Sequence, residues 1–341
     1  MKKFLLSLVA FMLMSVTSAL AQTSLVATLS HDGKLSTYYG PDALSEAYED
    51  AVDGDVITLS SGIFKTITVS KAITIRGAGM EKHDETLPTI IYNDDQSLKT
   101  FQITDIPNKK SLQIEGISFE ALVEINDDYS NHVVSDVKFL KCKFIYSTSL
   151  SSTTTSFINC KIMSGLGLSE SIFHRAYVDA INCIIGSSNS GNGLFAVDHC
   201  VMLGNYEYLW KAIITNSIFT NASSYCIDND CVVSDCLGVE SENDNRDYFA
   251  DISTSDENRN QMVYGYEKVF KTFKGNADGS ETYELTDEAA AKYLGSDGTQ
   301  VGIYGGSMPF DPVPSSAQVK HFSVKTSEKD NGNISVTINV E

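Results

Sequence analysis

The chain has 341 residues, of which 42% are hydrophobic and 10% aromatic, and this content is ample for a large core. Such a composition excludes an intrinsically disordered protein. With 25 basic and 44 acidic residues the formal charge is −19, a surface that repels nucleic acid and anionic membranes. The same surface would repel a polyuronate unless cations bridged the two.

The N-terminus has the pattern of a secretory signal peptide, predicted over residues 1–21. Lys2 and Lys3 precede an apolar run over 4–16, and residues 19–21 (Ala-Leu-Ala) supply a small-residue cleavage site. Its removal leaves 23 basic and 44 acidic residues, a formal charge of −21. No later segment has the ~20 consecutive apolar residues of a transmembrane helix. We therefore expect a secreted or periplasmic protein, and association with the cell surface stays open.

Residues 22–54 are predicted to form a hairpin followed by a helix that caps a solenoid. VATLSHDGKLSTYY alternates at a period of two around Asp32-Gly33, a dipeptide typical of hairpin turns. In the next segment Pro41 suits the first helical position, and apolar residues recur at i, i+3, i+4 and i+7. A solenoid exposes core and strand edges at its ends, so the amphipathic helix is expected to cover one of them.

Residues 55–245 contain an internal repeat, which predicts an all-β, right-handed parallel β-helix. The segments FLKCKF, FINCKI, AINCII, VDHCVM, ITNSIF and VSDCLG align at spacings of 18, 23, 17, 17 and 19 residues. Each unit alternates apolar and polar residues over short runs, which is strand periodicity. Repeated every ~20 residues, such a unit coils into a parallel solenoid in which equivalent residues stack in columns. The aligned central column consists of Cys142, Cys160, Cys183, Cys200, Ser217 and Cys236.

The columns of the repeat predict separate structural roles. Cysteine is a small apolar filler, so the cysteine column is expected to line the narrow interior. Asn, Asp, His or Lys stands before each cysteine, which predicts a bend with left-handed backbone, and stacked asparagines could share hydrogen bonds there. Asp198-His199-Cys200 is therefore interpreted as one rung, because neighbouring strand residues point apart. The alternative, a nucleophilic or metal site, would require the three side chains to converge.

The seven cysteines are an odd number and do not predict a disulfide framework. Side chains that stack in a parallel column lie side by side, which strains a disulfide between them. Cys226 and Cys231 are the one pair that could form a disulfide, and the sequence leaves this open.

Residues 246–308 are predicted to form a C-terminal capping region. The segment begins within an acidic, turn-rich run and then contains a short helix. Thr286 is the expected N-cap of this helix, Asp287 and Glu288 stand in its first turn, and Gly295 is expected to stop it.

Residues 309–341 are predicted to be a linker, marked by three prolines, and a terminal β-hairpin. The last 24 residues alternate at a period of two around Asn331-Gly332. This hairpin could pair with an edge of the solenoid or act as a separate docking element.

Two stretches carry a family likeness. ALSEAYEDAVDGDVITLSSGIFKTITVSKAITIRGAG resembles the entry to the right-handed parallel β-helix of the pectin-lyase-like superfamily. VGIYGGSMPFDP, followed by a hairpin, resembles the C-terminal region of uncharacterised exported bacterial β-helix proteins. The resemblance implies the fold over residues 24–341 and, because this fold hosts lyases, hydrolases, binding proteins and adhesins, little about activity.

Catalytic motifs of that superfamily do not carry over to this chain. Val197 to Cys200 resembles a Trp-Ile-Asp-His stretch of pectate lyases, but Ala196 and Val197 replace the first two residues and the stretch is not catalytic. The ordered Asn-Thr-Asp, paired Asp, His-Gly and Arg-x-Lys motifs of polygalacturonase-like hydrolases are missing.

Five residues are candidates for ligand binding. His174 and Arg175 lie in the longest rung, where a bulge could form a groove wall that Asp179 could join, and the arginine could neutralise a sugar carboxylate. A solvated loop with a surface ion pair is the alternative. Tyr206, Tyr208 and Trp210 alternate in NYEYLWK and would share one strand face suited to stacking on sugars, or would fill the core.

The acidic clusters predict no firm cofactor. Asp228-Asn229-Asp230 and the run over 240–257 could hold Ca²⁺, although a solvated acidic face is the simpler interpretation.

We expect a β-helix protein that recognises an extended ligand, a polysaccharide or cell-surface glycan, with no identifiable catalytic set. A polysaccharide lyase or glycoside hydrolase is the alternative, and the sequence does not predict the oligomeric state.

Overall fold

The computed structural model describes most of the chain. The described residues are 25–92, 100–107, 110–126, 134–168, 176–189, 193–204, 209, 211–220, 227, 230–250, 259–275, 281–315, 319–326 and 334–340, the backbone alone being described over 188–189 and the last two ranges.

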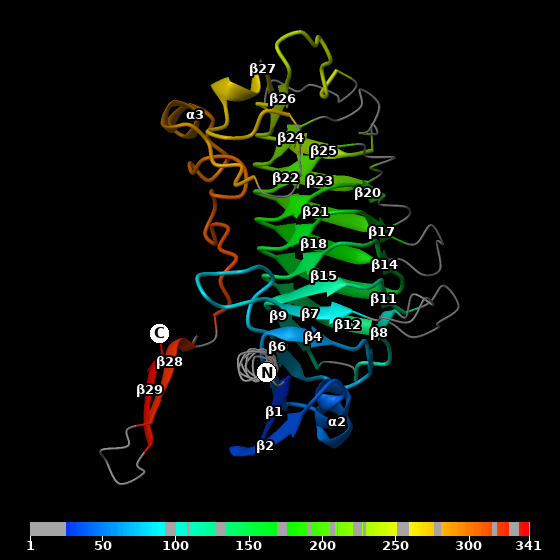
Figure 1. Cartoon of the computed structure of the whole chain (residues 1–341). Coiled ribbons are helices and arrows are strands. Elements are labelled where there is room, and N and C mark those ends of the chain that lie inside the picture. Colours follow the sequence, from blue (N-terminus) through cyan, green and yellow to red (C-terminus); the bar gives the residue numbers. More distant parts are fainter. Residues whose placement is uncertain are drawn as a thin grey trace, which may run out of the picture.

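Three long sheets, formed almost wholly of parallel strands, make up the body of the protein, a parallel β-helix (Figure 1). Sheet A consists in spatial order of β2 (Lys34–Tyr39), β1 (Val26–His31), β3 (Val56–Leu59), β6 (Thr74–Arg76), β9 (Leu112–Glu115), β12 (Val134–Leu140), β15 (Thr153–Ile158), β18 (Tyr177–Ile181), β21 (Leu194–Asp198), β23 (Ala212–Thr215) and β25 (Val232–Ser234). Sheet B consists of β4 (Gly62–Phe64), β7 (Thr89–Tyr92), β10 (Ile117–Glu120), β13 (Lys143–Phe144), β16 (Lys161–Ile162), β19 (Ile184–Ile185), β22 (Val201–Leu203), β24 (Ile218–Thr220), β26 (Leu237–Glu240) and β27 (Gln261–Tyr264). Sheet C consists of β5 (Thr68–Val69), β8 (Phe101–Ile103), β11 (Val123–Ile125), β14 (Thr148–Leu150), β17 (Leu166–Leu168) and β20 (Ser188–Asn189).

The cysteine column lies inside the coil, as the repeat predicts. Cys142, Cys160, Cys183 and Cys200 are fully buried, and Cys236 is 3% exposed. Successive rungs are joined through the column, since Cys160 N–H donates to Cys183 Sγ at 3.4 Å. Buried phenylalanines form a parallel stack beside it, with the Phe139 and Phe157 centroids 5.2 Å apart. Small thiols and large rings together fill the narrow lumen.

The residue before each cysteine adopts the left-handed backbone conformation that the repeat predicts. The φ angles are +52° for Lys141, +55° for Asn159, +50° for Asn182, +50° for His199, +53° for Asn216 and +57° for Asp235. This bend turns the chain from sheet A into sheet B in every coil, and Asn and Asp adopt it at the lowest cost.

The N-terminal elements close the first coil. β1 pairs antiparallel with β2 through a turn at Asp32-Gly33 and with β3 of the solenoid, which confirms the predicted hairpin. The helix α2 (Ala43–Asp50) follows and buries Leu44 against the lumen core. It begins after an N-cap at Asp42, so Pro41 precedes the helix and does not occupy its first position.

The C-terminal region packs against the outside of sheet B. Tyr248 and Phe249 join the lumen core near its last coil, where the Phe249 ring lies 5.8 Å from that of Phe219. The short helix η2 (Tyr266–Lys268) and α3 (Asp287–Lys292) belong to a second buried cluster on the outer face of β19, β22, β24 and β26. Thr286 caps α3 as predicted, its side chain accepting from Ala289 N–H at 3.1 Å.

The outward-facing column of sheet B explains why the C-terminal region packs against this face. Its members stand directly after the cysteine column and change along the solenoid from polar to apolar, in the order Ser118, Lys143, Lys161, Ile184, Val201, Ile218 and Leu237. Burying four apolar side chains outside the lumen stabilises the fold by roughly 1.5–3 kcal/mol each. Lys143 and Lys161 instead bind Glu81, at 2.9 Å and 2.7 Å.

Residues 295–315, here called the C-terminal strap, run back along the bends between sheets A and B (Figure 1, orange). Ser296 N–H donates to Asn216 Oδ1 at 2.7 Å near the last coils, and Ser315 N–H donates to Glu115 Oε1 at 2.7 Å near the first. Between them Asn182 Nδ2 donates to the carbonyls of Ile303 and Gly305, at 2.8 Å and 2.9 Å. The described part of the predicted linker, residues 309–315, therefore packs against the solenoid. Among the bend asparagines, Asn182 donates to this strap and Asn216 donates to Asp198.

The terminal hairpin is formed by β28 (Val319–Thr326) and β29 (Ile334–Val340), which pair antiparallel as predicted. The two strands make a sheet of their own, apart from sheets A, B and C, in the described part of the chain.

Candidate functional site

All five residues predicted to bind ligand, His174, Arg175, Tyr206, Tyr208 and Trp210, lie outside the described residues. The first two come just before β18 in the chain, and the other three just before β23. These predictions therefore remain untested. The strands that follow them belong to sheet A, whose outer face is described.

Exposed apolar side chains gather on the outer face of sheet A, over β18, β21, β23 and β25. Tyr177, Leu194, Ile213 and Val232, here called the sheet A patch, are 50%, 39%, 43% and 59% exposed. Tyr177 pairs in register with Leu194, and Ile213 with Val232. The two pairs belong to two columns of the sheet, because Ile213 pairs with Ala196 and not with Leu194. Neighbouring parallel strands lie about 4.8 Å apart, so each pair stacks along the solenoid.

Polar side chains border the patch in the neighbouring coils. Thr154 pairs with Tyr177, and the column that leads to Ile213 contains Lys138, Ser156 and Asp179. Hydroxyl, carboxylate and ammonium groups at regular spacing beside an aromatic ring can bind the hydroxyls and the apolar face of an extended sugar chain.

Asp198-His199-Cys200 is a rung in which Cys200 points away from His199, as predicted, whereas the Asp198 and His199 side chains contact each other. Cys200 Sγ lies in the lumen, 3.4 Å from the carbonyl oxygen of Ala180. His199 is 2% exposed at the bend, where Nδ1 lies 3.1 Å from Asp198 Oδ2 and Nε2 lies 3.2 Å from Thr299 Oγ1 of the strap. The thiol is thus separated from the imidazole, and His199 is the member of the triplet that contacts the strap.

Burial raises the pKa of Asp198, but hydrogen bonds from His199, Thr215 and Asn216 lower it more, so that the net pKa lies below the usual value. The charged carboxylate is therefore the form that the folded protein stabilises.

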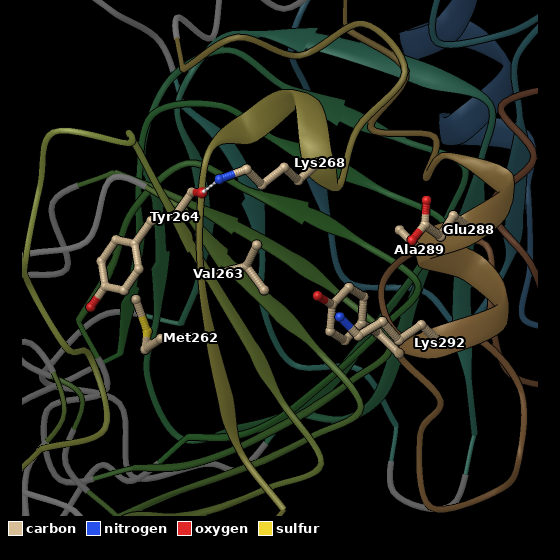
Figure 2. A pocket seen from close by; sticks show the side chains of 8 residues that line it. Met262, Val263, Tyr264, Lys268, Glu288, Ala289 and Lys292 are labelled. Carbon is tan, nitrogen blue, oxygen red and sulfur yellow. Dashed lines mark hydrogen bonds between the residues drawn. The ribbon is translucent and has the colours of Figure 1, made fainter.

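A hollow of about 500 Å³ lies between β27 and α3, below η2 (Figure 2). Its lining consists of Met262, Val263, Tyr264, Lys268, Glu288, Ala289, Lys292 and Tyr293. The side chain of Val263 points toward α3, whereas those of Met262 and Tyr264 point to the other side of β27 (Figure 2). Sequence reasoning missed this hollow because η2 and the strand β27 come after the end of the recognisable repeat.

A buried carboxylate anchors the chain behind this hollow. Glu240 is 2% exposed and accepts hydrogen bonds from Tyr248 OH at 2.5 Å and Tyr266 OH at 2.8 Å. Arg246 Nη2 lies 2.8 Å from the same carboxylate. Burial, followed by the hydrogen bond to Glu240, raises the pKa of both tyrosines well above the usual range. Glu240, the first residue of the acidic run, is therefore part of an internal network, whereas Glu242, Asn243 and Asp247 are exposed, as the interpretation of a solvated face predicts.

Neither a metal centre nor a membrane span occurs within the described residues. No three His, Cys, Asp or Glu side chains converge there to hold an ion. Asp228 and Asn229 of the proposed Ca²⁺ cluster lie outside the described ranges, as do residues 251–257 of the acidic run. In the same part of the chain, no helix combines the length and the apolar character needed to cross a bilayer.

The cysteine pair considered for a disulfide is described only in part. Cys231 is buried, and its thiol donates to the carbonyl oxygen of Leu209 at 2.9 Å. Cys226 lies outside the described residues.

Comparison with known proteins names no relative. No protein-family model matches the chain, and no curated protein matches it. Functional arguments therefore depend on the chain's own surfaces.

Proposed function

We propose that this chain is an exported β-helix protein, akin to the pectin-lyase-like superfamily, that binds an extended polysaccharide or cell-surface glycan along the outer face of sheet A. The sheet A patch is the observation that carries the proposal, because two stacked pairs of exposed apolar side chains, one of which includes an aromatic ring, favour a partner. Export rests on the signal-peptide pattern of residues 1–21.

The arrangement of the patch favours a sugar polymer. Ligand units bound along the solenoid would meet the same column of side chains in coil after coil, at intervals of about 4.8 Å. Tyr177 supplies a ring for stacking, and Thr154, Ser156 and Asp179 supply hydrogen-bonding groups beside it. The predicted ligand residues Arg175 and Trp210 stand two positions before Tyr177 and Ala212, at the starts of β18 and β23.

The test is retention of the protein on immobilised or gel-embedded polysaccharides, neutral and acidic. We expect Tyr177→Ala to weaken retention on the bound glycan, because a stacked ring is lost. Tyr39→Ala is the matched control, since Tyr39 is 67% exposed on the N-terminal hairpin, away from the patch. Equal retention of the parent protein and Tyr177→Ala would contradict the proposal.

Product analysis in the same assay separates binding from catalysis. A binding protein leaves the polymer intact. Unsaturated products from acidic polysaccharides, or new reducing ends from neutral ones, would replace the proposal with the lyase or hydrolase alternative.

A further inference from the structure

The hollow between β27 and α3 combines an apolar wall with charged groups at its rim. Val263 and Ala289 contribute aliphatic surface, and the nearly buried Tyr293 contributes a ring. Lys268 and Lys292 provide two ammonium groups, and Glu288 one carboxylate. A volume of about 500 Å³ lies in the usual range for pockets that bind small molecules, roughly 300–1,000 Å³.

The two lysines are held in place by contacts that leave donor capacity. Lys268 Nζ donates to the carbonyl of Tyr264 at 2.7 Å and to Glu242 at 2.9 Å, which uses two of its three N–H groups. Its hydrogen bond to Glu242 raises the pKa of Lys268, so the amine stays charged at neutral pH. Lys292 Nζ lies 4.9 Å from the centroid of the Tyr293 ring.

Lys292 is not neutralised by the acidic residue one turn before it. Glu288 and Lys292 stand at i and i+4, the spacing at which a helical ion pair normally forms. No ion pair within 4.0 Å joins them among the described residues, where the salt bridges of this region are Lys268–Glu242, Lys271–Glu284 and Lys271–Asp287. Both charged groups are thus available to a ligand in the hollow.

The edge of sheet B adds main-chain donors at the same place. β27 is the last strand of sheet B in the described chain, and Gln261 N–H and Gly265 N–H donate to Cys236 and Glu240 of the preceding segment. In a parallel ladder alternate residues bond to the same neighbour, so the N–H groups of Met262 and Tyr264 lie on the free edge. Main-chain N–H groups beside ammonium groups favour an anion.

We propose that this hollow binds a small hydroxy-carboxylate, represented by a single uronic acid, with its carboxylate at Lys268 and Lys292 and a hydroxyl on Glu288. The ammonium groups and the edge N–H groups recognise the carboxylate, Glu288 accepts from the hydroxyl, and Val263 and Ala289 pack against carbon. One acidic unit fits this site better than an acidic polymer, because the chain as a whole carries a formal charge of −19.

The experiment is ligand-observed NMR and calorimetric titration of the whole protein with glucuronate, glucose, acetate and phosphate. We expect saturable binding of glucuronate, weaker binding of acetate and phosphate, and no binding of glucose. Lys292→Gln should weaken glucuronate binding roughly tenfold or more, because a charge-assisted hydrogen bond is lost. Lys34→Gln removes the same charge from exposed Lys34 at the other end of the solenoid and should leave the affinity unchanged.

Three outcomes would overturn the proposal: no glucuronate binding, equal binding of glucose and glucuronate, or an affinity that Lys292→Gln leaves intact. Phosphate binding as tight as glucuronate would also overturn it, in favour of a plain anion site. The site is independent of the glycan surface on sheet A, so Tyr177→Ala should leave glucuronate binding unchanged while it weakens retention on polysaccharide.

Discussion

Lys141 and Asp311 are 170 residues apart in the sequence, yet Lys141 Nζ lies 2.8 Å from Asp311 Oδ2. Lys141 stands at a bend with a φ of +52°, and its ammonium group also contacts the carbonyl of Val313. The contact illustrates how the C-terminal strap is held. Bend residues whose type suits the left-handed backbone conformation also bind the strap with their side chains.

Asn182→Ala should lower the free energy of unfolding more than Asn159→Ala. Both asparagines are left-handed bend residues, so both variants carry the same backbone cost. Of the two, Asn182 donates to two strap carbonyls, at 2.8 Å and 2.9 Å. Its loss removes the hydrogen bond to the buried Gly305 carbonyl, whereas the Ile303 carbonyl still accepts from Phe310 N–H at 2.7 Å. We expect a difference of about 2 kcal/mol, measured by denaturant unfolding. Equal losses would show that the strap does not stabilise the solenoid.

Gly305→Ala should detach the strap, whereas Gly298→Ala should not. A Cβ on Gly305 would lie 2.6 Å from His199 Cδ2 and still closer to the carbonyl oxygen of Gln300. A Cβ on Gly298 meets open space, and its cost of about 1 kcal/mol comes from a φ of +80°. Hydrogen exchange should therefore show lost protection over 295–315 in Gly305→Ala, at a stability cost of at least about 3 kcal/mol. Retained protection there would contradict the packing of the strap against His199.

Acid should loosen the strap. Burial raises the pKa of Asp311, but the hydrogen bonds from Lys141 and Val313 N–H and the positive charge of Lys141 together lower it more, and Asp198 and Asp297 likewise have lowered pKa values. A carboxyl whose pKa is lower in the folded state stabilises that state above its unfolded pKa, about 4, and loses this contribution as the pH falls.

Hydrogen exchange of residues 295–315 should therefore be slow at pH 7 and accelerate below about pH 4, once corrected for intrinsic exchange. Asp311→Asn should reduce this pH dependence, since it removes one of the three titrating groups. A corrected rate that is the same at both pH values would refute the electrostatic contribution.

The column thiols should be unreactive in the native protein. Burial raises the pKa of Cys142 and Cys236 to about 12, so the thiolate is scarce at pH 8. Native protein treated with a thiol reagent, then mapped by mass spectrometry, should show no label at Cys142, Cys160, Cys183, Cys200 or Cys236. Denaturation should expose all five. Rapid native labelling of any of them would mean that the lumen is open to water.

The sequence predicts the lumen well because the lumen repeats. Each coil presents the same steric demands, so cysteine recurs inside and Asn or Asp recurs at the bend, and one alignment shows both. The strap has no period of its own, and its glycines and prolines are typical of a linker. The sequence indicates the strap only indirectly, through the change from Lys143 and Lys161 to Ile184 and Val201 in the outward column of sheet B. Apolar residues at these outward positions predict that another segment packs over them.

The ligand surfaces were harder to predict for a related reason. Sequence reasoning favoured His174 and Arg175 from IFHRAYVD, whereas the described exposed residues of this segment are Tyr177 and Asp179. Alternation shows that neighbouring residues face opposite ways but not which face is covered. The hollow at β27 depends on a helix and a strand that come from different parts of the chain, and no local pattern reports that proximity.

The strap runs from the late coils of the solenoid back to the early ones, and this direction determines the order in which the protein can fold. Ser296 contacts a late coil and Ser315 an early one, 200 residues before it in the chain. A polypeptide that emerges N-terminus first can form one coil after another by local winding. The outer face of sheet B nevertheless remains exposed to solvent until the C-terminal residues bind to it. Contacts of such long sequence separation form slowly, so the folding chain should pass through an intermediate in which the coils are wound but the strap is not yet bound.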